Sequence, residues 1–286
     1  MADLAIQKHL LKTVLSLPTP ALRAAAGGQA AYVGGRTLDP RLQFLLQAGA
    51  VRAPLQSLPI EEARRAFAET WAMVAARPEA GVAKETLTVE GPRGPVPVRL
   101  YRPAEPDADM APLVYAHFGG GTLGGLESCD AFCSILAKGV RGPVLSVDYR
   151  LAPEHRFPAG LEDVLAVFRH ARDHAQALGG PEGHAAIGGD SIGGNFAAAI
   201  CQELRRLGEP QPSLQLIVYP PLDATAQTQS MVTYGGYPPS RELMQWQFAH
   251  YIGAGDDPSD PRISPLKAKD RAGLAPAVVV TAGVDP

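Results

Sequence analysis

The hydrophobic and polar positions of the chain follow two different periods, and the change between them falls near residue 84. Before it, apolar residues recur every three or four positions, which predicts helices over residues 4–15, 38–48 and 60–76. Pro18 and Pro20 end the first helix, because proline removes a backbone donor and clashes with the preceding turn. This helix lacks a basic polar face, so we expect it to pack against the protein rather than lie on a membrane.

After residue 84 the pattern predicts strands. Residues 85–90 and 96–101 alternate apolar and polar positions around the turn G-P-R-G, which is typical of a hairpin. Further strands are predicted over residues 113–116, 144–147, 185–187, 214–219 and 277–281, and further helices over residues 129–138, 158–177, 192–207 and 240–251. Strands separated by helices imply a mostly parallel sheet with helices on both faces, which is an α/β fold.

Length and composition indicate a soluble globular protein. With 286 residues, of which 46% are hydrophobic and 19% charged, the chain is long enough for one large domain with an accessory part. The net charge of −3, without runs of Lys or Arg, predicts no binding to nucleic acid and no stable membrane association. Asp3 and Lys8 argue against a signal peptide. The three cysteines cannot pair fully, which predicts reduced thiols in a cytoplasmic protein.

A serine in a glycine-rich turn is the strongest chemical signal. Residues 188–194 read G-G-D-S-I-G-G and contain G-x-S-x-G, the pattern of a nucleophile elbow. In an elbow the serine lies on a strained turn between a strand and a helix, and the small neighbours let these two elements approach closely. An ordinary glycine turn would explain the motif taken alone. Because a strand is predicted before it and a helix after it, we interpret Ser191 as a nucleophile.

A second glycine run offers donors for the negative charge that acyl transfer creates. Residues 117–121, H-F-G-G-G, directly follow the predicted strand 113–116. Glycines at this point allow backbone N–H groups to point into a cavity at close range, and the amide of Ile192 would be a further donor. A flexible loop is the alternative, but it does not explain why the run follows an apolar strand upstream of G-x-S-x-G.

These two motifs, together with D-Y-R-L-A-P-E-H-R-F-P-A over residues 148–159, resemble the hormone-sensitive-lipase-like esterases of the α/β-hydrolase superfamily. The resemblance runs from about residue 38 to the end. It implies an α/β-hydrolase fold with a helical cap, and it implies hydrolysis of short- to medium-chain carboxylic esters with no cofactor and no metal. Residues 148–159 are expected to brace loops near the site.

The resemblance also assigns roles to individual residues. Ser191 would be the nucleophile, and the N–H groups of Gly119, Gly120 and Ile192 would bind the oxyanion. Asp285 stands where the family has the acid that orients the base. Taken without the family, Asp285 is equally well explained as an ordinary loop aspartate before a proline.

The chain departs from the family pattern near the expected acyl group. Phe118 replaces the first glycine of the loop, Gly121 stands where the family has Phe or Trp, and Ile192 replaces alanine. Phe118, Gly121 and Tyr219 are the candidate substrate-pocket residues. Because the side chain of Ile192 is branched, we hypothesise that Ile192 and Phe118 favour small acyl groups.

The family's catalytic histidine follows the aspartate, whereas all seven histidines of this sequence precede Asp285. We therefore expect a family member that lacks its C-terminal strand, helices and histidine. A polypeptide ending at Pro286 should be inactive or nearly so, because a serine hydroxyl without a base is a weak nucleophile. The exposed strand 277–281 would then favour a homodimer or poor expression. Alternatively, the natural protein continues.

The predicted organisation has four parts. Residues 1–48 form an N-terminal cap, 49–223 the first part of the core, 224–258 a cap insertion, and 259–286 the strand that bears the acid. The predicted function is a serine carboxylesterase acting on a small-molecule ester. Two alternatives stay open: a hydrolase-like receptor or carrier that keeps the pocket without the base, and an amidase or deacetylase with the same triad.

Overall fold

The computed structural model describes residues 2–49 and 53–286, with side chains described for residues 6–48 and from residue 53 on. The chain divides into two compact units. The first comprises Met1–Ala75, Gln227–Trp246 and Ala282–Pro286, and the second comprises Ala76–Ala226 and Gln247–Thr281. The side chain of Leu4, which we placed on the apolar face of the first helix, lies outside the described residues, as do residues 50–52 at the predicted start of the core.

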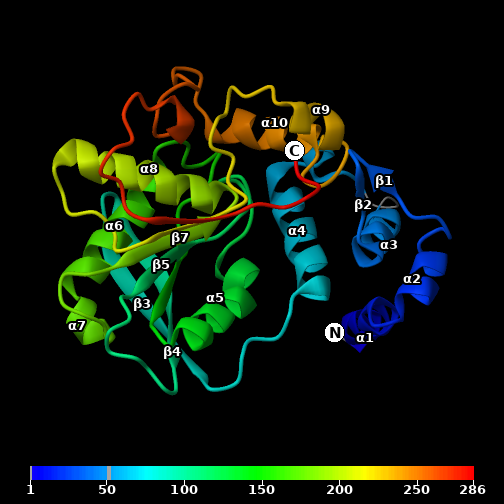
Figure 1. Cartoon of the computed structure of the whole chain (residues 1–286), viewed down its shortest axis with the longest axis horizontal. Helices are drawn as coiled ribbons and strands as arrows, with labels where there is room; N and C mark the ends of the chain where they lie inside the picture. Colours follow the sequence, from blue (N-terminus) through cyan, green and yellow to red (C-terminus); the bar gives the residue numbers. More distant parts are fainter. Residues whose placement is uncertain (1, 50–52) are drawn as a thin grey trace. The chain divides into compact units, whose positions relative to one another are not determined.

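The second unit is built on one sheet (Figure 1). Its strands are β3 (Val82–Gly91), β4 (Gly94–Pro103), β5 (Leu113–Ala116), β6 (Val144–Val147), β7 (Ala186–Asp190), β8 (Gln215–Val218) and β9 (Ala277–Val280). Within the described residues their order is β3-β4-β6-β5-β7-β8-β9. β3 pairs with β4 and β4 with β6 in antiparallel fashion, while the remaining pairs are parallel. The carboxyl ends of β5, β7 and β8 therefore lie side by side.

Helices cover both faces of this sheet, as predicted. They are α5 (Leu126–Val140) on one face, and α6 (Ala159–Asp173) and α8 (Ile192–Leu207) on the other. The unit also contains α7 (Ala175–Leu178), the later part of α10 (Arg241–Tyr251) and the short 3-10 helix η2 (Pro265–Lys267). Alternate residues of β5 enter two hydrophobic clusters. Val114 packs with residues of α6 and α8, whereas Tyr115 packs with Cys129 and Cys133 of α5. The alternation of side chains along a strand thus separates the two layers.

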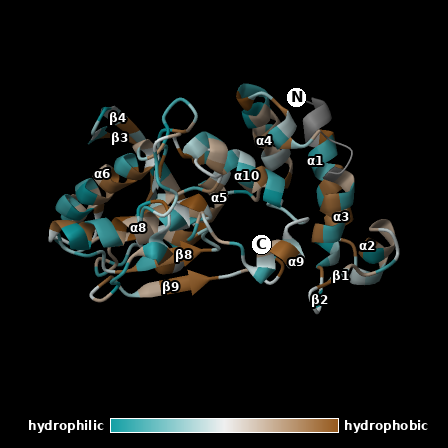
Figure 2. Ribbon diagram, turned by 90° about the horizontal axis from the view of Figure 1, so that it is seen from above, coloured by the Kyte–Doolittle hydropathy of each residue, from teal (hydrophilic) through white to brown (hydrophobic). Residues whose placement is uncertain are grey.

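β9 differs from the other parallel strands because its side chains are exposed. Val278, Val279 and Val280 keep 45%, 57% and 45% of their surface accessible, although the strand is wholly apolar. Figure 2 shows it as a hydrophobic arrow at the edge of the sheet, next to β8. Unpaired edge strands offer free backbone donors and acceptors to another chain.

The first unit contains mostly helices. Its elements are α1 (Ala2–Leu15), α2 (Thr19–Ala25), β1 (Tyr32–Val33), β2 (Arg36–Thr37), α3 (Pro40–Gly49), η1 (Leu55–Ser57), α4 (Ile60–Val74), α9 (Gln229–Tyr234) and the first part of α10. It includes much of the two predicted cap segments, 1–48 and 224–258, and our division into cap and core stays a prediction. Among the helices of the described residues, none combines the length and apolar content that a membrane crossing requires.

Most predicted elements are confirmed, and β5, β6 and α8 begin and end where the sequence placed them. Two helices were not predicted. The proline pair at residues 18 and 20 ends α1 but also starts α2, because proline is tolerated in the first turn of a helix. The segment that follows residue 223, over which the sequence pattern predicts no helix before residue 240, contains α9. Its start is capped by the Thr228 hydroxyl, which accepts from the Met231 amide at 3.3 Å.

Candidate active site

Ser191 lies between β7 and α8 with the backbone conformation of an elbow. Its φ of 54° and ψ of −121° place a non-glycine residue in the left-handed half of the map, which costs conformational energy. The Ser191 amide donates to the carbonyl of Val218 on β8 at 2.9 Å. Its side chain is partly exposed and makes no capping hydrogen bond with α8. The hydroxyl is therefore not used to hold the helix.

The small residues of the motif permit the close approach that the elbow needs. A Cβ atom at Gly193 would collide with the carbonyl of Ala116 at the end of β5, and one at Gly189 would collide with the backbone of Gly193. The first turn of α8 thus lies directly against β5 and β7. This contact brings the residue before α8 next to the loop that leaves β5.

The glycine loop begins at that point. β5 and β7 are parallel neighbours, with Ala116 opposite Gly189, so residues 117–121 leave the sheet beside the elbow. Gly119, Gly120 and Gly121 have φ values of 125°, 63° and 71°, which residues with a side chain rarely adopt. The turn is closed by the Leu123 amide donating to the Gly119 carbonyl at 3.0 Å.

The backbone donors of this region are unused. Among the residues that the structure describes, the N–H groups of Gly119 and Gly120 have no acceptor. The N–H group of Ile192 opens α8, and the first amides of a helix have no partner within the helix. Such donors stabilise a negatively charged oxygen when one forms between them.

Residues 148–159 brace the glycine loop, as expected. The Tyr149 hydroxyl donates to the backbone carbonyl of His117 at 2.8 Å, and its ring stacks on the imidazole with 4.2 Å between centroids. The Ala152 amide donates to the carbonyl of Gly121, also at 2.8 Å. Both ends of the loop are therefore fixed to one segment.

The last turn of α10, which belongs to the second unit, lies over the same loop, and no sequence pattern predicted this contact. A Cβ atom at Gly120 would meet the side chain of Gln247, and one at Gly121 would meet the ring of Tyr251 at 2.8 Å. Glycine is thus required at these positions for two reasons: the positive φ values, and the side chains packed where a Cβ would lie. No motif around residues 247–251 signals this contact.

His117 is buried and does not titrate near neutral pH. Burial lowers the pKa of its imidazole to about 4, and its Nδ1 lies 2.7 Å from the carbonyl oxygen of Phe118. An imidazole that is shielded from solvent and stacked on Tyr149 supports the loop rather than exchanging protons with a substrate.

Asp190, the residue before Ser191, carries a buried carboxylate. It is 5% exposed, its Oδ2 accepts a hydrogen bond from the Tyr219 hydroxyl at 2.7 Å, and its Oδ1 lies 3.7 Å from the Sγ of Cys129. Burial raises the pKa of this carboxyl, and the hydrogen bond from Tyr219 opposes that rise. In the sequence, Asp190 is noted only as part of the G-x-S-x-G motif region, and no local pattern indicates its partner.

The candidate pocket residues and Ile192 lie in different surroundings. Phe118 packs beside the cluster under α5, whereas Ile192 is 1% exposed and belongs to the cluster under α6 and α8. Tyr219 is 40% exposed, but its hydroxyl bonds to Asp190. The carbonyl of Gly121 accepts a hydrogen bond from the Ala152 amide, and as a glycine this residue places no side chain in the region.

Asp285 lies in the final segment, which belongs to the first unit. The side chain is partly buried, and this burial raises the pKa of its carboxyl. The segment is held there by the Ser230 hydroxyl, which donates to the carbonyl of Pro286 at 2.6 Å. Ser191 belongs to the second unit, so the pairing of the nucleophile with an acid at residue 285 stays a prediction.

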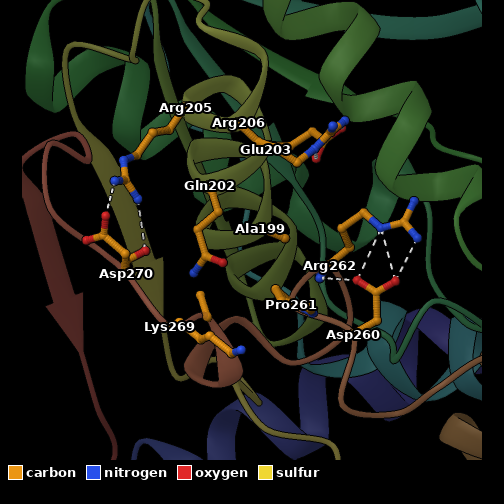
Figure 3. A pocket seen from close by; sticks show the side chains of 11 residues that line it. Ala199, Gln202, Glu203, Arg205, Arg206, Asp260, Pro261, Arg262, Lys269 and Asp270 are labelled. Atoms are coloured by element: carbon orange, nitrogen blue, oxygen red, sulfur yellow. Dashed lines mark hydrogen bonds and ion pairs between the residues drawn. The ribbon is translucent and has the colours of Figure 1, made fainter.

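A separate cavity of about 470 Å³ lies along α8, between this helix and residues 260–270 (Figure 3). Charged side chains dominate its lining, and most of them form ion pairs: Arg205 with Asp270, Arg206 with Glu203, and Arg262 with Asp260. It contains neither the elbow nor the glycine loop. Elsewhere in the described part of the chain, no group of three or more His, Cys, Asp or Glu side chains is placed to hold a metal ion.

Comparison with known proteins agrees with this geometry. A family model described as "alpha/beta hydrolase fold" matches residues 113–286. The carboxylic ester hydrolase LipN of Mycobacterium tuberculosis is 40% identical, over 96% of this chain and 76% of that protein. The ethyl acetate hydrolase of Pseudomonas putida is 36% identical, over 87% of this chain and 82% of that protein.

Solved structures give the same picture. The hyperthermophilic esterase of Pyrobaculum calidifontis superposes with a TM-score of 0.78 at 34% identity, over 85% of this chain and 78% of that one. An α/β-hydrolase enzyme from the metagenome of Lake Arreo superposes with a TM-score of 0.76 at 39% identity, over 82% of this chain and 75% of that one. The strand order, the elbow and these matches lead to one assignment: the chain belongs to the hormone-sensitive-lipase-like esterases of the α/β-hydrolase superfamily.

Proposed function

We propose that the protein is a serine carboxylesterase that hydrolyses short- to medium-chain carboxylic esters through an acyl-enzyme on Ser191. One observation carries the proposal: Ser191 is held at a φ of 54° beside a glycine loop whose amides have no acceptor in the described residues. A strained serine next to unused donors is typical of a nucleophile facing an oxyanion hole. The family relationship supports the same chemistry.

The reaction follows from this arrangement in two halves. In the first, the Ser191 Oγ attacks the ester carbonyl carbon and gives its proton to a base, and the carbonyl oxygen becomes an oxyanion bound by the amides of Gly119, Gly120 and Ile192. The carbonyl re-forms, and the alcohol leaves with the proton from the base. In the second half, water attacks the acyl-enzyme by the same route and releases the acid.

The base is a histidine in this family, and we propose Asp285 as the acid that orients it. An ionised aspartate fixes the imidazole and stabilises its charged form. Among residues 1–286 we assign no histidine to this role. Activity should therefore be measured on the product of the complete gene, with the polypeptide of residues 1–286 as a comparison that we expect to be inactive or nearly so.

The substrate preference is proposed from the residues around the loop. Phe118, Gly121 and Tyr219 are our pocket candidates, and the branched Ile192 is expected to favour small acyl groups. One relative is named for the hydrolysis of ethyl acetate, which supports small esters as substrates. Replacing Ile192 with Ala should shift the preferred acyl chain to a longer one in an acyl-length series, and an unchanged preference would contradict this view.

The setting of the enzyme is also part of the proposal. Cys129, Cys133 and Cys201 are free and buried, which supports a reducing compartment such as the cytoplasm. In the polypeptide of residues 1–286, the exposed edge strand β9 supports a homodimer.

The test uses p-nitrophenyl acetate, butyrate and octanoate with wild-type enzyme and Ser191→Ala. We expect hydrolysis that is fastest for the short esters, with a loss of roughly 10⁴- to 10⁶-fold in kcat for Ser191→Ala. Equal rates for both proteins would overturn the assignment of the nucleophile. Tight binding of a small ester or acid without turnover would favour the receptor or carrier instead, and faster cleavage of matched anilides than of esters would favour an amidase or deacetylase.

A further inference from the structure

We propose that Tyr219 is a positioning residue of the nucleophile elbow and acts on Ser191 through the carboxylate of Asp190. The inference rests on the proposed function, and it gives the hydroxyl of Tyr219 a role distinct from contact with the substrate.

The backbone of Tyr219 is as unusual as that of Ser191. Among the described residues, the non-glycine positions with positive φ are Arg141, Ser191 and Tyr219, the last at 35°. Tyr219 directly follows β8, and its amide donates to the carbonyl of Val280 at 2.7 Å. Two of these three strained positions thus lie at the ends of the neighbouring strands β7 and β8. Unfavourable backbone conformations are kept only where the surrounding structure enforces them, and they are found most often at functional sites.

The side chain of Tyr219 extends to β7 and contacts Asp190. Its hydroxyl donates to the Oδ2 of Asp190 at 2.7 Å, although 40% of the residue surface is exposed. Asp190 is 5% exposed, and in the described part of the chain no Lys or Arg forms an ion pair with it. Two further groups lie near this carboxylate: the buried Tyr115 hydroxyl, which lowers its pKa but forms no hydrogen bond with the described residues, and the thiol of Cys129, a weak donor at 3.7 Å. The Tyr219 hydroxyl is therefore the strong donor that this buried carboxylate has.

Two hydrogen bonds now join the same short stretches of β7 and β8. The Ser191 amide donates to the carbonyl of Val218, the last residue of β8. The hydroxyl of the next residue, Tyr219, donates to Asp190, the last residue of β7. Together they fix Asp190 and the peptide unit that precedes the serine Cα. A buried carboxylate deprived of its donor would turn toward another partner and carry the preceding peptide with it. Displacement of a nucleophile by about 1 Å can cost on the order of 10²-fold in rate.

The test compares Tyr219→Phe with a matched control on the complete gene product. Tyr101→Phe removes a similar bond, because the Tyr101 hydroxyl donates to the Oδ1 of Asp130 at 2.8 Å between β4 and α5. For Tyr219→Phe we expect kcat to fall roughly 10- to 100-fold on acetate, butyrate and octanoate esters alike, with KM within about twofold. For Tyr101→Phe we expect kcat within about twofold of wild type.

Two results would overturn the inference: a kcat for Tyr219→Phe within about twofold of wild type, or a change in KM that grows with acyl length, which would indicate a pocket residue. Absence of activity in the wild type, or activity that survives Ser191→Ala, would instead refute the proposed function. If Tyr219→Phe fails to fold by circular dichroism, Asp190→Asn and Asp190→Ala decide. Asn keeps an acceptor for Tyr219, so its kcat should exceed that of Ala at least about tenfold at equal KM, and equal kcat values would overturn the inference.

Discussion

β7 and β9 are both short parallel strands that flank β8, yet their burial is opposite. All five residues of β7 are buried, although two of them are glycine. All four residues of β9, Ala-Val-Val-Val, are exposed. Strand propensity and hydrophobicity favour β9, but β7 lies between β5 and β8 and is covered by α8.

The difference teaches that position in the sheet, rather than the composition of a strand, decides where the site forms. A central strand has neighbours on both sides, so the residue after it is held between two other strand ends. Ser191 follows such a strand and bonds to β8 while the glycine loop leaves β5. An edge strand has one neighbour and offers no such enclosure.

The largest expected effect, a loss of most activity, tests the packing behind β7. Gly193→Ala forces a methyl group against the Ala116 carbonyl, which should destabilise the protein by about 3 kcal/mol and remove most activity. Gly139→Ala in α5 is the matched control, because nothing lies within 4 Å of its added Cβ. That change should stabilise by about 0.5–1 kcal/mol. Urea unfolding measures both, and equal effects would contradict the assigned contact.

A second test compares the strands directly. Ile187 on β7 is fully buried, so Ile187→Ala should cost about 2–5 kcal/mol of unfolding free energy. Val279 on β9 is 57% exposed, so Val279→Ala should cost less than about 1 kcal/mol. Thermal and denaturant unfolding of the two variants provide the measurement. Similar losses would mean that β9 is covered in solution.

The smallest effect on stability concerns association through β9. In the polypeptide of residues 1–286, Val279→Lys should change the unfolding free energy by about 0.5 kcal/mol or less, because the side chain already faces solvent. The same charge should prevent edge-to-edge pairing and convert the expected homodimer to a monomer. Light scattering of both proteins measures this, and a wild-type polypeptide that is monomeric throughout would refute the expected dimer.

The sequence predicted the features that depend on local patterns. Helix α8, strands β5 and β6 and the elbow follow from period, glycine placement and motif, each of which acts within a few residues. β7 was predicted to end at residue 187 but continues to Asp190, because Gly188 and Gly189 pair in the ladder without an apolar side chain to signal it.

Contacts between distant segments could not be predicted in the same way. The bond from Tyr219 to Asp190 and the packing of Gln247 over Gly120 join residues that are far apart along the chain, and no local composition encodes either pair. The helix α2 was missed for another reason: the same proline that ends one helix is compatible with the first turn of the next.

The stacked imidazole under the glycine loop has a consequence for the response to acid. Since the pKa of His117 is lowered to about 4, the glycine loop keeps one charge state throughout the neutral range. A change of activity with pH in that range therefore reports the titration of other groups. An unfolded histidine accepts its proton near pH 6.5, so this residue contributes its full stability above that value. This contribution declines as the pH falls toward 4. Acidification therefore lowers the free energy of unfolding, because the unfolded chain binds the proton more readily than buried His117 does.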